Sequence, residues 1–124
     1  TPDSCHPFLP QSIKSSSLSA LRIHFLKAST DSLSCYQTNE KIPLIVMDAH
    51  GTNILEFQWP KDFRLLIGEE GRGIAPLLKQ MKLENNKLAV QTVSIPTQNV
   101  ESLNVSTATA IALFHRISKI PVRK

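Results

Sequence analysis

Three short apolar runs have the length and composition of buried strands. Residues 43–47 are apolar and lead into 48–51, residues 63–67 stop at a glycine, and residues 89–95 alternate before a proline. Runs of four to eight mainly aliphatic residues bounded by turn residues are typical of strands inside a sheet. We therefore predict strands over 43–47, 63–67 and 89–95, with a turn over 48–51 closing the first.

Other segments have helical spacing. Between 104 and 117 the apolar residues recur every three or four positions among Ser, Thr and Ala. This pattern predicts a helix with a small-residue face that can pack closely. The spacing also predicts a helix over 74–81 and a short surface helix over 29–39.

The first part of the chain has a less regular pattern. Residues 1–11 hold three prolines, which predicts an irregular lead-in. A short turn of helix is expected at 15–17, and the alternating apolar residues of 21–26 predict a strand.

Strands that alternate with helices over short connections predict an α/β fold with a mostly parallel sheet. The chain has 124 residues, of which 41% are hydrophobic, enough for one modest core. We therefore expect residues 1–124 to form a single domain.

Charge and composition narrow the class of protein only slightly. The net charge is +4 and the sequence pI is near 9.3, which permits attraction to a polyanion such as RNA. No run approaches the roughly 20 apolar residues that span a bilayer, and there is no signal-peptide pattern. We expect a cytoplasmic protein with no membrane partner.

Metal-ligand spacing is also absent from the sequence. Cys5 and Cys35 lie in unrelated contexts, so they are expected to be free thiols. The four histidines are scattered, and each is expected to be exposed or to be partly buried with a hydrogen-bond partner. We predict no metal site.

A glycine-rich turn follows the predicted strand 63–67. Its spacing, Gly68-x-x-Gly71-x-Gly73, differs from the dinucleotide fingerprint and from the phosphate-binding loop that ends in Lys-Ser/Thr. Glycines here either build a plain turn or let backbone groups approach a ligand closely. Spacing alone leaves both interpretations open.

Two longer segments resemble a known family. Residues 65–74, Leu-Leu-Ile-Gly-Glu-Glu-Gly-Arg-Gly-Ile, are similar to the second motif of SpoU-type RNA 2′-O-ribose methyltransferases. Residues 95–108, Ile-Pro-Thr-Gln-Asn-Val-Glu-Ser-Leu-Asn-Val-Ser-Thr-Ala, resemble the third motif. The resemblance is looser over 14–20. Two motifs in order, joined by a predicted helix and strand, form a specific pattern.

The resemblance implies a fold and an activity. It implies a three-layer α/β knot, with a mostly parallel sheet threaded into a trefoil, of which this chain is the C-terminal, N-terminally truncated part. It also implies transfer of a methyl group from S-adenosylmethionine to a ribose 2′-hydroxyl of tRNA or rRNA. Family members are usually homodimers through the last helix, and the small residues of 108–112 suit such packing.

The resemblance also assigns roles to residues. The backbone at Leu66 and Gly68 would line the adenosine, and Ile95 and Leu103 would hold the adenine by main-chain contacts. Pro96 would end the strand so that the next loop wraps the ligand. The implied cofactor-binding residues are Leu66, Gly68, Ile95, Pro96, Ser102, Leu103 and Asn104.

Further residues would support catalysis or bind RNA. Glu70 would fix an arginine or loop backbone, and Ser102 and Asn104 would present polar groups beside the cofactor. Two alternatives stay open: Glu70 is a solvated loop carboxylate, and Asn104 is only the N-cap of the last helix. Lys14 and Arg72 are the candidate RNA-binding residues.

The sequence departs from the family pattern at two places. The first motif, an asparagine followed by an arginine thought to act as base, is not found; thirteen residues precede Lys14 and none is arginine. We expect the base to lie outside this chain. The loop 97–100 is a residue shorter than expected and lacks a glycine. A non-catalytic RNA-binding or assembly module with the same fold is the alternative hypothesis.

Overall fold

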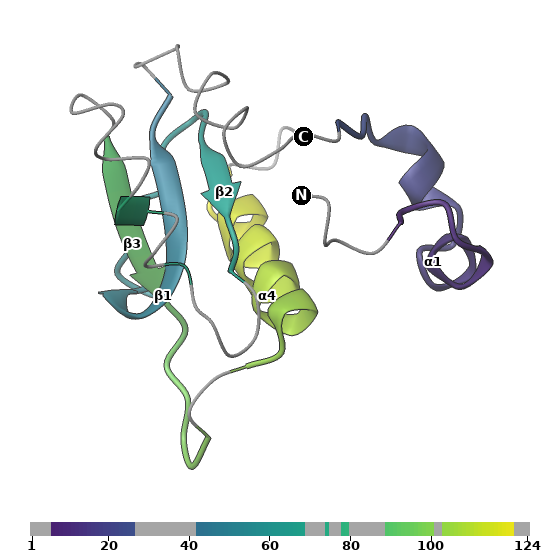
Figure 1. The fold of residues 1–124 in the computed structure, drawn as a ribbon. Coiled ribbons are helices and arrows are strands. Elements are labelled where there is room, and N and C mark those ends of the chain that lie inside the picture. The colour runs from purple at the N-terminus through teal and green to yellow at the C-terminus, as the bar shows by residue number, and fades with distance from the viewer. Residues whose placement is uncertain are drawn as a thin grey trace. The chain divides into compact units, whose positions relative to one another are not determined.

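The computed structural model describes residues 6–26, 42–68, 74, 78–79, 89–100 and 103–120. Contacts divide the chain into two units, Thr1–Thr38 and Asn39–Lys124, which are described separately below. The regular elements are α1 (Pro10–Ser15), η1 (Ser19–Arg22), β1 (Leu44–Asn53), β2 (Arg64–Leu66), β3 (Val90–Ser94) and α4 (Val105–Ser118) (Figure 1).

The three predicted strands are confirmed, and they form one parallel sheet in the order β2-β1-β3 (Figure 1). Both neighbours run parallel to β1, and Val46 is in register with Leu66 of β2 and with Thr92 of β3. The central strand holds three buried residues, Leu44, Ile45 and Val46, as expected for a strand with neighbours on both sides. The predicted α/β fold with a parallel sheet is therefore present.

The prediction that the first strand closes in a turn at 48–51 is wrong. β1 continues to Asn53, and both Met47 and Thr52 pair with Val93, so the residues between them form a bulge. Gly51 lies so close to β3 that a Cβ built on it would fall 2.6 Å from the Val93 nitrogen. The Ser94 hydroxyl donates to the Gly51 carbonyl at 2.9 Å. We call residues 48–51 the β1 bulge.

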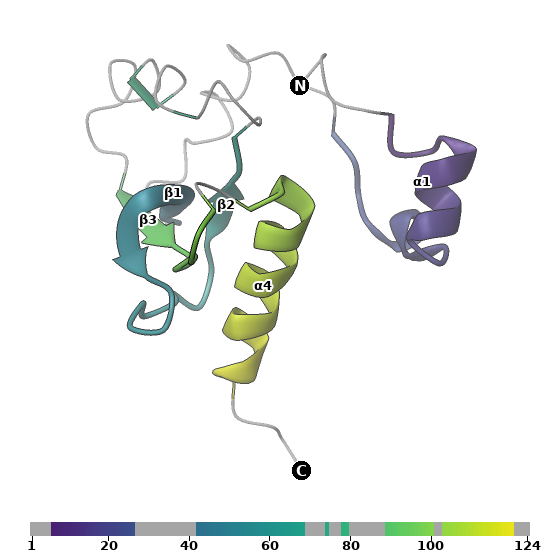
Figure 2. The same ribbon diagram turned by 90° about the horizontal axis from the view of Figure 1, so that it is seen from below.

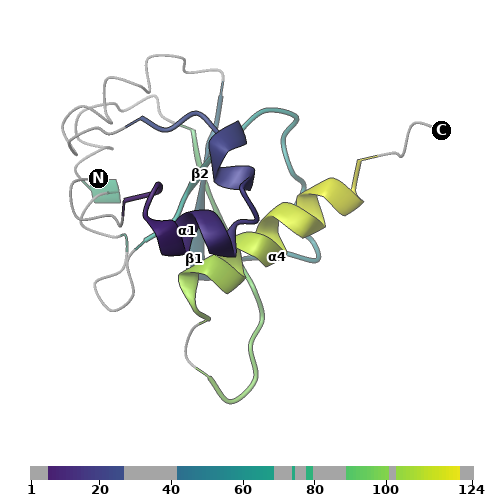
Figure 3. The same cartoon turned by 90° about the vertical axis from the view of Figure 1, so that its right-hand side faces the viewer.

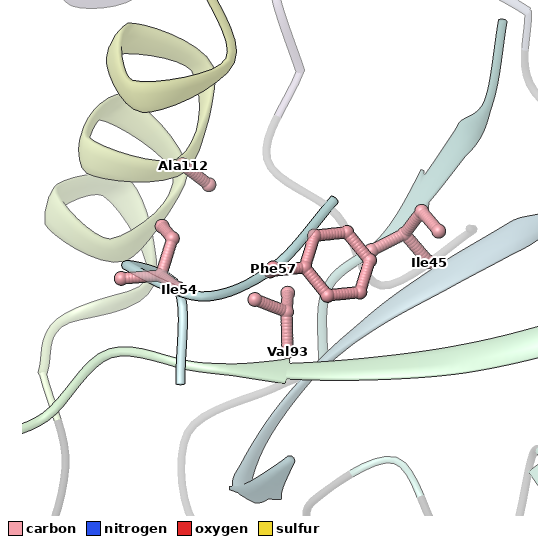
Figure 4. Packing of buried hydrophobic residues seen from close by; sticks show 5 residues of the cluster. All are labelled: Ile45, Ile54, Phe57, Val93 and Ala112. Atoms are coloured by element: carbon pink, nitrogen blue, oxygen red, sulfur yellow. The ribbon is translucent and has the colours of Figure 1, made fainter. Parts of the chain in front are cut away.

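Side chains that alternate along β1 enter two separate apolar clusters. Ile45 packs with Val93 and with Ala112 of α4, as Figure 4 shows together with two residues of the β1–β2 connection. Val46 packs instead with Ile74. Because successive strand residues face opposite sides, α4 packs against one face of the sheet, and Ile74 and Leu78 pack against the other. Among the described residues, both faces of the sheet therefore contact apolar side chains.

The predicted C-terminal helix is confirmed as α4. Asn104 is its N-cap, with Oδ1 accepting hydrogen bonds from the Ser106 backbone N–H at 2.9 Å and from the Ser106 hydroxyl at 2.7 Å. Figure 2, seen from below, shows α4 running beside the sheet. Ala112 is fully buried, whereas Phe114 is 73% exposed. The helix thus contributes one narrow face to the core.

In the unit Thr1–Thr38 the structure describes residues 6–26, and two predictions there are wrong. Residues 10 and 11 belong to α1 rather than to an irregular lead-in, and 21–26 is not a strand (Figure 3). Ser17 and Leu18 have positive φ values of 48° and 67°, which turn the chain out of α1 into the 3-10 helix η1. Ile23 is 61% exposed.

Two predicted helices lie mainly outside the residues that the structure describes. The segment 29–39 lies outside the described residues. Of 74–81, only Ile74, Leu78 and Lys79 are described; the Leu78 N–H donates to the Ile74 carbonyl at 3.0 Å, and Leu78 and Lys79 are helical. This hydrogen bond is consistent with the start of a helix at Ile74.

Candidate functional site

The two sequence motifs follow strands that end at the same edge of the sheet. Leu66 is the last residue of β2, and Ile95 comes directly after β3. Since both strands run parallel to β1, their carboxyl ends lie at one edge, which is where open α/β sheets bind ligands (Figure 1). Two strand spacings, roughly 10 Å, separate β2 from β3 across the sheet.

The side chains of the two motifs do not converge. Leu66 packs in the cluster of Val46, on one face, whereas Ile95 packs in the cluster of Ile45, on the other. Gly68, Ile95 and Leu103 lie outside the regular elements and are half-buried. The groups that these residues can offer to one ligand at this edge are therefore backbone N–H and carbonyl groups.

The loop between β3 and α4 starts at Ile95 and Pro96. The Thr97 hydroxyl donates to the Val100 carbonyl at 2.9 Å, which holds the loop in a tight turn. Asn99 has a φ of 61°, in the left-handed region that glycine and asparagine adopt most readily. Asn99 therefore supplies the conformation for which this loop would otherwise need a glycine.

Asn104 has a structural role that its residue type predicted. Its side-chain oxygen accepts the two hydrogen bonds from Ser106, so the N-cap interpretation is confirmed. Leu103, immediately before it, is half-buried. Whether Asn104 also touches a cofactor stays a prediction.

Other candidate residues are placed only in part. Glu70, Arg72 and Ser102 lie outside the described residues. Lys14 lies exposed in the last turn of α1, in the unit Thr1–Thr38. Pro96 is exposed at the start of the loop after β3. Their assigned roles stay predictions.

The β1 bulge adds polar groups to this edge that sequence reasoning did not place there. Val46 of β1 pairs with Leu66 of β2. Two residues further along, β1 contains Asp48 and the chain after β2 contains Gly68. Asp48 Oδ1 accepts a hydrogen bond from the His50 backbone N–H at 2.8 Å and lies 3.4 Å from His50 Nδ1. The sequence marked these residues as a turn, but only strand pairing shows that they belong to the central strand.

The described residues hold neither a membrane-spanning helix nor a cluster of metal-binding side chains. Among them, no helix combines the length and apolar character needed to cross a membrane. The same residues contain no group of three or more His, Cys, Asp or Glu side chains suited to hold a metal ion.

Comparisons with known proteins agree with this architecture. Residues 1–114 match the model of the SpoU rRNA Methylase family. Over 113 residues the chain is 30% identical to ribosomal RNA small subunit methyltransferase G 2 of Syntrophobacter fumaroxidans; the match takes in 90% of this chain and 20% of that protein. The chain thus spans one fifth of the length of this curated relative.

Two solved structures share the fold. A putative RNA methyltransferase of the TrmH family from Porphyromonas gingivalis is 29% identical, with a TM-score of 0.67 over 90% of this chain and 44% of that one. The SpoU methyltransferase AviRb from Streptomyces viridochromogenes, solved in complex with the cofactor AdoMet, is 22% identical, with a TM-score of 0.74 over 94% of this chain and 44% of that one.

Proposed function

This chain belongs to the SpoU rRNA methylase family, and from that premise we propose that its protein is an RNA methyltransferase that uses S-adenosylmethionine. The reaction is transfer of a methyl group to a ribose 2′-hydroxyl of tRNA or rRNA. The observation that carries the proposal is the common edge: the two family-like motifs begin where β2 and β3 end, on either side of β1.

The chemistry of this edge suits S-adenosylmethionine. The residues Gly68, Ile95 and Leu103 are half-buried and lie outside the ladder and the helix, which supports the proposal that their backbone groups hydrogen-bond an adenosine. Pro96 has no N–H with which to extend β3, which lets the chain leave the sheet at this point. When bound, S-adenosylmethionine would supply a methyl group activated by its sulfonium.

The reaction needs few groups from the protein. The ribose 2′-oxygen forms a bond to the methyl carbon as the carbon–sulfur bond breaks, S-adenosylhomocysteine leaves, and the 2′-proton passes to a base. In this proposal Glu70 orients the loop, Ser102 and Asn104 border the cofactor, and Lys14 and Arg72 bind RNA phosphates. No residue of this chain is assigned as the base.

The assembly belongs to the same proposal. Ala112 packs in the core of the chain, so the small residues 108–112 do not all face a partner as expected from the sequence. α4 instead exposes Leu113, Phe114 and Ile117 on the side away from Ala112. An exposed apolar helix face of this kind favours a protein partner, and a second copy of the chain is the one that the family resemblance implies. The resemblance also implies that the last segments of the sheet thread through a loop and form a trefoil knot.

Calorimetric titration tests the cofactor site. S-adenosylmethionine and S-adenosylhomocysteine should each bind the chain saturably. Gly68→Val should abolish binding because the valine side chain would fill the space through which the ligand reaches the backbone. Asn104→Ser keeps a capping hydroxyl and should keep the fold, but it should bind more weakly because the amide is gone. Thr107→Ala, on the exposed face of α4, is the matched control and should bind like the unchanged chain.

Absence of binding would favour a different function. If the folded chain, checked by circular dichroism, binds neither compound, the non-catalytic RNA-binding module becomes the better hypothesis. For the full-length protein, incubation with unmodified RNA and labelled S-adenosylmethionine should yield 2′-O-methylated nucleosides in mass spectrometry. Methyl groups found only on the bases would contradict the proposed 2′-hydroxyl target.

A further inference from the structure

The apolar anchorage of α4 on the sheet is narrow. Within its 14 residues, only Ala112 is fully buried. A methyl group is the smallest side chain that can pack in a core, so it fixes the orientation of a helix poorly. Other contacts must therefore help to hold α4 in place.

Two hydrogen bonds near the end of α4 supply such contacts. The Trp59 indole Nε1–H donates to His115 Nδ1 at 2.9 Å, and Arg116 Nη2 donates to the Lys61 carbonyl at 3.1 Å. Both partners outside the helix belong to the connection between β1 and β2. The connection therefore ties the second half of α4 to the sheet.

The Trp59 ring is itself fixed by other aromatic rings. Phe57 contacts it edge-on with ring centroids 5.0 Å apart, and Phe63 contacts it at 5.1 Å. Phe57 is buried in the core cluster that includes Ala112. Because Trp59 is held in this way, its N–H keeps a constant direction toward α4.

The Trp59–His115 hydrogen bond is the better satisfied of the two. Trp59 and His115 are both half-buried, and the N–H donor meets a nitrogen acceptor at short range. By contrast, Arg116 Nε is buried without a hydrogen-bond partner in the part of the chain that the structure describes. The hydrogen bond at His115 is also partly shielded from water, whereas the one at Arg116 Nη2 is exposed.

This hydrogen bond requires one protonation state of the imidazole. His115 Nδ1 accepts, so it must carry a lone pair, and the single ring proton lies on Nε2. A proton taken up from solvent at Nδ1 would make this nitrogen a donor that faces the indole donor. The hydrogen bond would then be lost, and the two N–H groups would repel each other.

We propose that His115 is a positioning residue whose protonation releases the second half of α4 from the β1–β2 connection. The charged residues on the two segments that meet here are Arg116 on α4, Lys119 directly after it, and Glu56, Lys61 and Asp62 on the connection. The rings packed around Trp59 are uncharged. The inference rests on packing and hydrogen bonding and does not require the cofactor site.

Fluorescence tests the pH response, because Trp59 is the only tryptophan in the chain. Lowering the pH from 8 to 5, the range over which histidines commonly change charge, should change its emission while the far-UV circular dichroism stays constant. His115→Asn keeps an oxygen acceptor that does not titrate, so its emission should be constant over this range. His50→Gln removes an exposed histidine and should respond like the unchanged chain.

Hydrogen exchange at pH 8 tests the position of the helix separately. His115→Phe keeps a ring but loses the acceptor, so amides of residues 113–118 should exchange about fivefold faster, the factor that one net hydrogen bond represents. His115→Asn should exchange at a rate close to that of the unchanged chain. Equal exchange in His115→Phe and His115→Asn, or an emission change that persists in His115→Asn, would overturn the proposal.

Discussion

Gly51 occupies a position in the β1 bulge where no side chain fits. A Cβ there would lie 2.6 Å from the Val93 nitrogen and 2.7 Å from the Thr92 carbonyl carbon, and both are backbone atoms of β3. Backbone atoms inside a sheet cannot move aside as the end of a flexible side chain can. The absence of a side chain at Gly51 is therefore what lets β1 resume its pairing with β3 at Thr52.

Replacement of Gly51 by alanine tests this contact. Gly51→Ala should lower the free energy of unfolding by about 1–3 kcal/mol, the usual cost of inserting a methyl group into a tightly packed place. Urea denaturation followed by circular dichroism measures the change. Ala49→Ser, at an exposed position of the same bulge, should have little effect, and a loss as large as that of Gly51→Ala would show that the bulge as a whole is fragile.

Residue types predicted some contacts and could not predict others. Asn104 was a candidate N-cap because its short side chain can accept from a nearby backbone N–H, a local property, and the structure confirms it. The hydrogen bond between Trp59 and His115 joins positions 56 residues apart, and nothing local in the sequence indicates it. The family resemblance named Gly68 and Ile95, but only the strand register shows that they share an edge.

The junction between α1 and η1 depends on backbone conformation rather than on side-chain packing. The Ser17 N–H donates to the Lys14 carbonyl and the Leu18 N–H to the Ile13 carbonyl, each at 3.2 Å. This pair of hydrogen bonds is the Schellman motif, which requires a left-handed residue at its centre, here Ser17. Glycine is the residue that adopts this conformation at least cost.

A glycine at this centre should therefore strengthen the junction. Ser17→Gly should stabilise the motif by about 1 kcal/mol, the cost that a left-handed conformation imposes on a residue with a Cβ. Slower hydrogen exchange of the amides of residues 17 and 18, measured by NMR, is the expected result. Ser15→Gly, the same change inside α1, should speed that exchange, and faster exchange in Ser17→Gly would contradict the assignment.

The same junction explains why one predicted strand is wrong. Leu21, Ile23 and Phe25 alternate with polar residues, which is the pattern of a strand with one buried face. Pattern analysis cannot detect that Leu18 turns the chain into a 3-10 helix just before this segment. The strands predicted at 43–47, 63–67 and 89–95 are present because these apolar runs are long enough to be buried in a sheet, although the first strand continues to Asn53.

The unit Asn39–Lys124 exposes a large apolar side of α4. Phe114 is 73% exposed and Ile117 64% exposed, and both lie on a helix whose opposite side reaches the core at Ala112. Leaving such groups in water lowers solubility and favours association. The proposed homodimer would bury this apolar surface of α4, which is exposed in the single chain.

A charge placed on this surface tests the homodimer. Phe114→Glu should leave the helical content unchanged but shift the sedimentation coefficient from that of a dimer to that of a monomer, because a carboxylate would be buried at the interface. Lys119→Glu introduces the same group directly after the helix and should leave the dimer intact. A wild-type chain that sediments as a monomer at high concentration would refute the homodimer.

The central place of β1 in the sheet also sets the order in which a growing chain can complete its core. Among the described residues, the C-terminal end of β1 pairs with β3, and the cluster around Ile45, which also holds Ile54 and Phe57, is completed when Ala112 arrives. Parallel strands joined over long distances pair slowly, and their bare faces attract other chains meanwhile. A chain whose synthesis ends between residues 94 and 112 would lack Ala112 on the face of the sheet that holds Ile45. Such a product would expose apolar side chains to which chaperones can bind.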